Sequence, residues 1–344
     1  MSSTGSERLR RSNTDRAGIT RRRRGKGWSF RDADGQPVDV ATRERVAHLA
    51  VPPAWRDVWI CPHPNGHIQA FGTDDAGRRQ YLYHERWRLE RDEAKHDRVL
   101  RLAKKLPRVR ETLEADLRRP GLARDRVLAV GLRMLDHGVL RVGGEQYERE
   151  HGTRGVATLN RGDVRIHGDT VVCEVLTKGG VERIVAITDP VLAKAVSAIR
   201  RGRTGSRRLL VWRDGRGYHD VHADDLNDRF KELAGDDFTV KDLRTWQATV
   251  VAAVELAMVV LPGKATAQRR VEKQAMAEVA EYLGNTATIA RNSYVDPRVV
   301  EGFEEEHTIE RSLDRQGVDD LDDLNDLPTR AAVERSVVRL LTRR

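Results

Sequence analysis

Several polar side chains of this chain stand out because their neighbours are unlike them. The segment RNSYVDP (291–297) follows an apolar helical pattern and carries one tyrosine, Tyr294, between polar residues. Nine residues before it, Asn285 follows Gly284 at the predicted end of a helix, where asparagine is an ordinary capping residue. Tyrosine is also a common core residue, so this segment alone leaves both packing and chemistry open for Tyr294.

Three cationic side chains have settings in which they could act on a phosphate. Lys178 lies at the tip of the predicted hairpin EVLTKGGVER, where a flexible ammonium can donate a proton to a leaving oxygen or can simply be solvated. Arg244 lies in the apolar segment VKDLRTWQATVVAAV, where an arginine is costly unless it is paired, for example with Asp242. Arg141 precedes Gly143 and could bind a phosphate with its guanidinium fork, or lie on the surface.

The elements that must position these residues are predicted from the pattern of apolar residues and turns. Short strands and glycine-containing turns over residues 22–90 predict a small antiparallel β-domain. Helical spacing over residues 91–310, interrupted by a hairpin at LTKGG, predicts a mostly helical catalytic domain with a small sheet. Residues 1–21 are expected to be a disordered basic arm, because they hold almost no apolar side chains. Residues 311–344 are expected to be an acidic linker and a tail, with a short helix in PTRAAVERSVVRLLTRR. The predicted fold class is α+β, with the two domains forming a clamp.

The charge of the chain is positive and unevenly distributed. A net charge of +9 and a pI near 9.8 are typical of nucleic-acid binders, although a solvated charged surface is a commoner cause of such a charge. Residues 1–30 hold nine Lys/Arg against two acids and contribute +7, whereas residues 301–326 hold eleven Asp/Glu against two arginines and contribute −9.

There is neither a long apolar run nor a secretory signal, so we expect a cytoplasmic protein without a membrane span. Cys61 and Cys173 show no metal or disulfide spacing.

Four motifs, taken together and in order, resemble a known family. LRVGGEQYEREHGTRGVATL, LTKGG, VKDLRTW and LGNTATIARNSYVDP are similar to segments of the poxvirus-like bacterial type IB DNA topoisomerases. The resemblance covers residues 27–306 and departs from the bacterial pattern at Gly144, where those relatives have asparagine. The active site of the family holds two arginines, a lysine, a histidine or asparagine, and a nucleophilic tyrosine. These positions correspond to Arg141, Arg244, Lys178, Asn285 and Tyr294.

The resemblance also implies where the protein would contact DNA. The segment GRRQYLYH (77–84) is similar to the part of the family's N-terminal domain that contacts DNA, and a further family tyrosine lies near the scissile phosphate. The residues expected to bind DNA are Arg79, Gln80, Tyr81, Tyr83, Tyr147 and Lys241.

The implied reaction is transesterification at a DNA phosphodiester. Tyr294 would attack phosphorus and expel the 5′-hydroxyl, and the resulting 3′-phosphotyrosyl bond would allow resealing without ATP. Arg141, Arg244 and Asn285 would stabilise the charge of the transition state. Lys178 would protonate the leaving oxygen. The cationic cluster would take the place of a metal ion, so no metal or cofactor is expected. The expected partner is double-stranded DNA, and the protein is expected to be a bacterial, nucleoid-associated monomer.

Two other functions are compatible with these residues. A tyrosine recombinase or integrase uses similar Arg/Lys/His/Tyr chemistry, although the β-rich N-terminal region and the lysine of KDLRTW, where recombinases usually have histidine, argue against it. A non-catalytic nucleic-acid-binding protein would need a degenerate site, whereas all five positions hold suitable residues.

Overall fold

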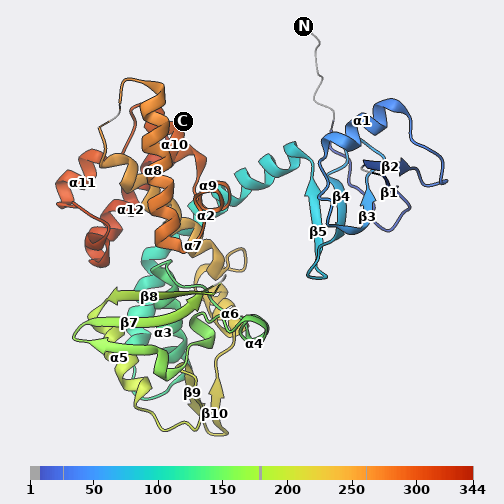
Figure 1. Cartoon of the computed structure of the whole chain (residues 1–344). Helices are drawn as coiled ribbons and strands as arrows, with labels where there is room; N and C mark the ends of the chain where they lie inside the picture. The colour runs from blue at the N-terminus through green and yellow to red at the C-terminus, as the bar shows by residue number, and fades with distance from the viewer. Residues whose placement is uncertain (1–7, 26, 178–179, 261, 344) are drawn as a thin grey trace. The chain divides into compact units, whose positions relative to one another are not determined.

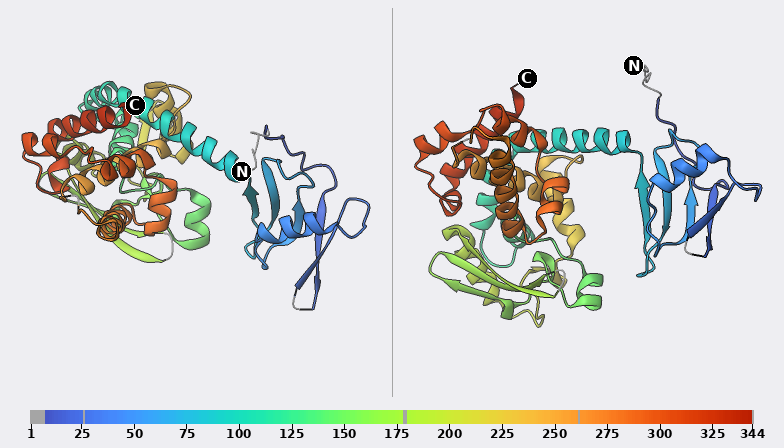
Figure 2. Two further views of the ribbon diagram at one scale, coloured as in Figure 1. Left: turned by 90° about the horizontal axis from the view of Figure 1, so that it is seen from above. Right: turned by 45° about the horizontal axis from the view of Figure 1, so that its top comes forward.

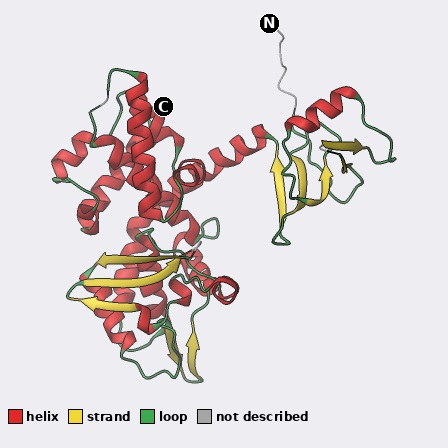
Figure 3. Cartoon of the chain, viewed as in Figure 1, coloured by secondary structure: helices red, strands yellow, loops and turns green. Residues whose placement is uncertain are grey.

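The structure, a computed structural model, describes residues 8–25, 27–177, 180–260 and 262–343. The chain divides into two compact units, one up to Lys95 and the other from His96 onwards. The first contains an antiparallel sheet, and the second is mostly helical with smaller sheets (Figures 1 and 3). The predicted α+β class is therefore confirmed. Among the described residues, no helix is long and apolar enough to cross a membrane.

The first unit is built on a five-stranded sheet. Its elements are β1 (Ile19–Arg24), β2 (Gly27–Arg31), α1 (Val40–His48), β3 (Arg56–Ile60), β4 (Ile68–Thr73) and β5 (Arg79–Tyr83). The strand order is β2-β1-β3-β4-β5, and all neighbours pair antiparallel. Helix α1 begins where the Asp39 carboxylate accepts a hydrogen bond from the Thr42 amide at 2.8 Å. The buried apolar side chains Ile19, Val46 and Ile60 hold the helix and strands together.

The expectation of a disordered arm over residues 1–21 is wrong for residues 8–21. Strand β1 begins at Ile19, which is 2% exposed and pairs with Ile60. Before it, the Arg16 carbonyl accepts from the Trp59 indole at 2.9 Å, and the Ser12 hydroxyl donates to the Ile68 carbonyl at 2.9 Å. These bonds join residues about 40 to 60 positions apart, so the segment is ordered by the sheet and not by its own composition. Residues 1–7 lie outside the described part of the chain.

The second unit contains most of the helices. Helix α2 (Glu85–Leu117) crosses the boundary between the units, and it is followed by α3 (Arg124–Asp136), α4 (Glu145–His151), η1 (Val156–Thr158), η2 (Arg161–Asp163), β6 (Val164–His167), β7 (Thr170–Thr177), β8 (Val181–Thr188), α5 (Pro190–Arg200), β9 (Val211–Asp214), β10 (Gly217–Asp220), α6 (Ala223–Ala234), α7 (Val240–Ala257), α8 (Ala265–Leu283), α9 (Ala287–Ser293), α10 (Pro297–Glu304), α11 (Glu310–Gln316), η3 (Asp322–Asn325) and α12 (Leu327–Thr342). Strands β6, β7 and β8 form one antiparallel sheet and β9 and β10 form a hairpin.

Helix α7 is the centre of this unit. Its sequence is apolar on almost every side, and nearly all of its residues are buried. A helix that is hydrophobic all round must be enclosed by other elements, and α3, α8, α10 and α12 all pack against α7. Figure 2 shows α8 and the C-terminal helices gathered on one part of the unit and the β6–β8 sheet on another. Residues carried by α7 are thus held from several directions.

Residues 311–344 differ from the predicted linker and tail. Helices α11 and α12 pack against each other and against α7, and Val333 and Val337 of α12 are completely buried. Only the part up to Asp326 is acidic, and within it Leu313 and Val318 also lie in the core. The predicted C-terminal helix is present as α12, and it is part of the folded unit.

Candidate active site

The candidate site lies at the C-terminal end of helix α8. Gly284 has a left-handed backbone (φ 62°), and the amide of Asn285 then donates to the Ala280 carbonyl at 2.9 Å. This is the hydrogen-bonding pattern of a glycine-terminated helix. The glycine is also needed for space, because a Cβ at position 284 would lie 2.8 Å from the Arg183 guanidinium. The sequence GN thus ends the helix and places the Asn285 amide directly beyond it.

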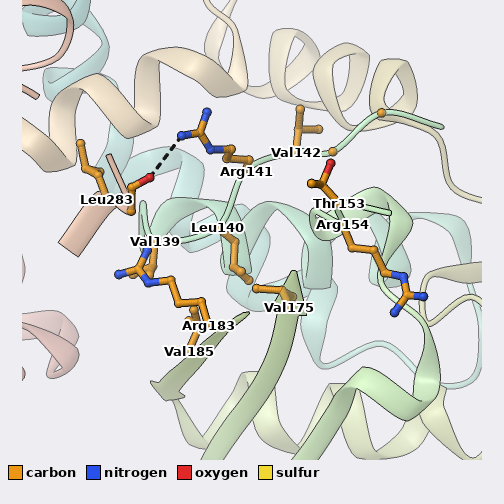
Figure 4. Close-up of a pocket in the computed structure, with 13 residues that line it drawn as sticks. Val139, Leu140, Arg141, Val142, Thr153, Arg154, Val175, Arg183, Val185 and Leu283 are labelled. Carbon is orange, nitrogen blue, oxygen red and sulfur yellow. Dashed lines mark hydrogen bonds between the residues drawn. The ribbon is translucent and has the colours of Figure 1, made fainter. Parts of the chain in front are cut away.

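Three guanidiniums from three different elements converge on the carbonyls at this helix end. Arg183 of β8 donates to the carbonyls of residues 281 and 282, Arg244 of α7 to that of residue 283, and Arg141, after α3, to that of residue 284 at 3.4 Å. The last carbonyls of a helix lack helical partners and carry partial negative charge, which favours cations. Figure 4 shows Arg141 and Arg183 extending from separate segments beside Leu283. The helix end therefore concentrates positive charge at one place.

Arg244 is the most buried of the three. It is 6% exposed, and it also donates to the carbonyls of Gly138 and Val139 at 2.8 and 3.3 Å. Burial, followed by repulsion from Arg141, lowers the pKa of Arg244 to about 10, with a partly opposing effect from Tyr294. A group with that pKa still carries its positive charge at neutral pH.

The suggested ion pair of Arg244 with Asp242 is replaced by these carbonyl bonds. The Asp242 carboxylate accepts instead from Arg98 at 2.7 Å and from the Thr239 amide at 2.9 Å. The charge of Arg244 is thus not neutralised by Asp242, and its Nε atom is buried without a hydrogen-bond partner among the described residues.

Asn285 presents a second unused donor. Its Oδ1 atom accepts from Arg141 at 2.6 Å, and a guanidinium can only donate, so the orientation of the amide is determined. The Nδ2 atom then points elsewhere, and within the described ranges it is buried and has no partner. Buried donors are normally satisfied, so two unpaired ones beside a cationic cluster are groups that could bind an oxyanion.

Tyr294 lies at the junction of α9 and α10, next to Arg244. Its ring centroid is 5.5 Å from the Arg244 guanidinium carbon, and its side chain is partly buried. The Thr249 hydroxyl accepts a hydrogen bond from the Asp296 amide at 3.1 Å, and its proton is shared between the carbonyls of Thr245 at 3.0 Å and Tyr294 at 3.4 Å. Because Thr249 and Arg244 are both on α7, one helix determines the spacing of guanidinium and phenol.

A cavity of about 400 Å³ lies beside Arg141. Its walls are mainly apolar and come from the loop after α3, strands β7 and β8 and the end of α8 (Figure 4). Charges beside such surfaces are poorly screened by water, so the guanidiniums act more strongly on a nearby anion than they would in bulk solvent.

The remaining predicted site residues are placed as follows. Lys178 lies outside the described residues. Strand β7 ends at Thr177 and strand β8 begins at Val181. Tyr147 is in α4, where only its backbone is described, and Lys241 is exposed in the first turn of α7. The structure thus brings together four of the five predicted catalytic positions: Arg141, Arg244, Asn285 and Tyr294.

The predicted DNA contacts of the first unit lie on its edge strand β5. Strand alternation puts the exposed side chains of Arg79, Tyr81 and Tyr83 on one face. The tyrosine rings are stacked with centroids 5.9 Å apart, and the Arg79 guanidinium covers the ring of Phe71 at 3.8 Å. Gln80 points to the other face, where its amide donates to Asp74 at 2.9 Å.

Arg183 was not predicted from the sequence. Its signal is the alternation of VERIVAI, in which Arg183 shares the inward face of β8 with the buried Val185 and Ile187. A charged residue on a core-facing position needs partners, and the end of α8 provides them.

Comparisons with known proteins agree with this geometry. Residues 84–315 match the family described as eukaryotic DNA topoisomerase I, catalytic core, and residues 27–74 match the bacterial DNA topoisomerase IB N-terminal domain. The chain is also 27% identical over 285 residues to DNA topoisomerase 1B of Acanthamoeba polyphaga mimivirus, covering 81% of this chain and 85% of that protein. A phenol beside clustered guanidiniums, in a chain that matches both parts of these enzymes, leads to one conclusion: the protein belongs to the type IB DNA topoisomerase family.

Proposed function

We propose that this DNA topoisomerase cuts and reseals one DNA strand through a covalent bond between Tyr294 and a 3′-phosphate, without ATP or a metal ion. The observation that carries the proposal is a pair of buried donors, Arg244 Nε and Asn285 Nδ2, that have no partner within the described residues. The Arg244 guanidinium also lies 5.5 Å from the centre of the Tyr294 ring. These donors suit the non-bridging oxygens of a phosphate.

The chemical step exchanges one phosphoester for another. The Tyr294 oxygen bonds to phosphorus as the bond from phosphorus to the 5′-oxygen breaks, and Lys178 supplies the proton that this oxygen needs. Arg141 and Arg244 hold positive charge at positions that are set before DNA binds, because the end of α8 and the turn after α3 anchor them. Preorganised donors of this kind lower the barrier without a further reorganisation cost. The reverse reaction reseals the strand.

The exposed face of β5 is the proposed DNA contact of the first unit. Stacked tyrosines and an arginine offer both aromatic and phosphate contacts. We assign residues 22–90 to DNA binding and residues 91–310 to catalysis, and propose a monomer that acts with the nucleoid in the cytoplasm. Closure of these two domains around DNA as a clamp stays a prediction.

Relaxation of a supercoiled plasmid in EDTA and without ATP tests the proposed function. We expect complete relaxation on a plasmid without special recognition sites, with protein attached covalently to DNA after denaturation. A requirement for Mg²⁺, ATP or a particular DNA site would contradict the proposal, and the last of these would favour a recombinase.

Replacing Lys178 with alanine should slow cleavage of ordinary DNA. The rate should recover on a substrate whose 5′ leaving oxygen is replaced by sulfur, because a thiol is far more acidic than an alcohol and needs no proton donor. Single-turnover cleavage of the two substrates measures this directly. If the variant is slow on both, Lys178 is not the general acid.

A further inference from the structure

We propose that Arg330 and Glu334 of helix α12 are positioning residues for DNA cleavage, acting through the turn that follows helix α3. Helix α12 lies beyond residues 84–315, which match the catalytic core of the family. The proposal rests on the catalytic role proposed above for Arg244, because the turn is one of the two anchors of that side chain.

The turn at residues 136–139 is held through four successive main-chain carbonyls. Each of them accepts a hydrogen bond from a side chain that comes from another element. In chain order the donors are Arg330, Tyr282 and Arg244, the last of which bonds two carbonyls. The turn is also tightly packed, since a Cβ at Gly138 would lie 2.6 Å from the Gln247 side chain. The backbone that anchors Arg244 is therefore shared with α12, and Arg141 follows the same turn two residues later.

A buried ionic network connects α12 to the turn. Arg330 is 3.2 Å from the Asp136 carboxylate and 3.3 Å from that of Glu334. Arg110 of α2 bonds the same two carboxylates, at 2.7 Å to Asp136 and 2.6 Å to Glu334. All four side chains are at least 90% buried, and two positive charges balance two negative ones.

The network keeps its charges in the folded protein. Burial raises the pKa of the Asp136 carboxyl, but Arg110 and then Arg330 more than offset this and hold the pKa well below its usual range. The same two arginines lower the pKa of Glu334 in spite of its burial. The neighbouring His137 is kept neutral at pH 7, because burial and the Arg330 charge lower its pKa to about 3.

Such a network suits a positioning role better than a stabilising one. A buried ion network often contributes little net stability compared with apolar residues of the same size, but its geometry is demanding. Here that geometry defines where the Asp136 backbone lies, and Gly138 is only two residues further along the chain. A shift of the turn would displace Arg244 from the phosphate that it is proposed to contact.

The test is the single-turnover rate of covalent adduct formation with saturating enzyme, measured well below the unfolding temperature of each variant. Arg330→Met should lower this rate about 10- to 100-fold, since a misplacement of about 1 Å can cost that much. Arg330→Lys should restore part of it, because it keeps the charge. The matched control is Val337→Ala, a completely buried apolar residue of the same helix. It should lower the unfolding temperature without changing the rate of the folded enzyme.

Glu334→Gln provides a second variant that keeps the size of the side chain, and it should also slow adduct formation. If the Arg330→Met protein does not fold, the Arg330→Lys and Glu334→Gln proteins decide the outcome. Rates equal to that of Val337→Ala would overturn the proposal. The Arg244→Ala protein in the same assay distinguishes a failure of the proposed function from a failure of this inference. A normal rate for Arg244→Ala refutes the proposed role of Arg244. A slow rate for Arg244→Ala, together with normal rates for the Arg330 and Glu334 variants, refutes only the role of α12.

Discussion

The Tyr294→Phe protein should bind supercoiled DNA as well as the unchanged protein does and form no covalent adduct. The substitution removes only the phenolic oxygen, and its ring can still pack 5.5 Å from the Arg244 guanidinium. DNA affinity depends mainly on many phosphate contacts, so the loss of one hydroxyl should barely change it. The attacking atom, in contrast, has no substitute, and relaxation should disappear. Denaturing gels with labelled DNA detect the adduct, and a filter-binding titration measures the affinity.

Tyr218→Phe is the matched control for this experiment. Tyr218 is 44% exposed on strand β10, and the same change there should leave relaxation intact. A persistent adduct in the Tyr294→Phe protein would remove Tyr294 from the role of nucleophile. A loss of adduct in both variants would mean that the assay reports a general loss of folded enzyme.

The Arg244→Ala protein should cleave DNA about 100- to 1,000-fold more slowly, the usual cost of losing one preorganised donor to a charged transition state. The Arg244 guanidinium carbon lies 5.5 Å from the centre of the Tyr294 ring, and the side chain also donates to three main-chain carbonyls around the site. Arg244→Lys should recover little, because an ammonium cannot reproduce the planar fork of a guanidinium. Single-turnover cleavage at saturating enzyme measures both variants.

Arg126→Ala controls for the cost of removing any buried arginine from the helical unit. Arg126 is 7% exposed on α3, and it donates to the Gly121 carbonyl at 3.0 Å. Its loss should change thermal stability more than the cleavage rate. Cleavage by Arg244→Ala at the rate of Arg126→Ala would exclude Arg244 from the site.

The sequence was a good guide wherever the signal was local. Strands β3 to β5 of the first unit, the hairpin strands on either side of LTKGG and the glycine that ends α8 all follow from periodicity and turn residues within short windows. It was a poor guide at both ends of the chain. Residues 8–21 hold few apolar residues, and the predicted C-terminal helix was expected to lie in a tail. Both are packed against distant partners, such as Ile60 for Ile19 and Arg110 for Glu334.

Within the candidate site, too, some residues could be predicted from local sequence and others could not. Arg141, Arg244, Asn285 and Tyr294 could be selected from the sequence, because the motifs that hold them, taken together and in order, resemble those of the type IB topoisomerases. Arg183 could not, since the alternation of β8 indicates only that this inward-facing arginine needs partners, and the partners are carbonyls of the distant helix α8. The choice between an ion pair and free charge for Arg244 was equally open, and the pairing of Asp242 with Arg98 decided it.

By itself, the amino-acid sequence determined which chemical groups this topoisomerase possesses and the helices and strands that carry them, because both depend on residue type and local spacing. Tertiary structure alone decided that three guanidiniums meet at the end of one helix, that the buried donors Arg244 Nε and Asn285 Nδ2 beside them have no partner among the described residues, and that the C-terminal helix holds the turn behind Arg244. The physical reason is that a buried charge is stabilised by partners that arrive from distant parts of the chain, and no local pattern records which partners those will be.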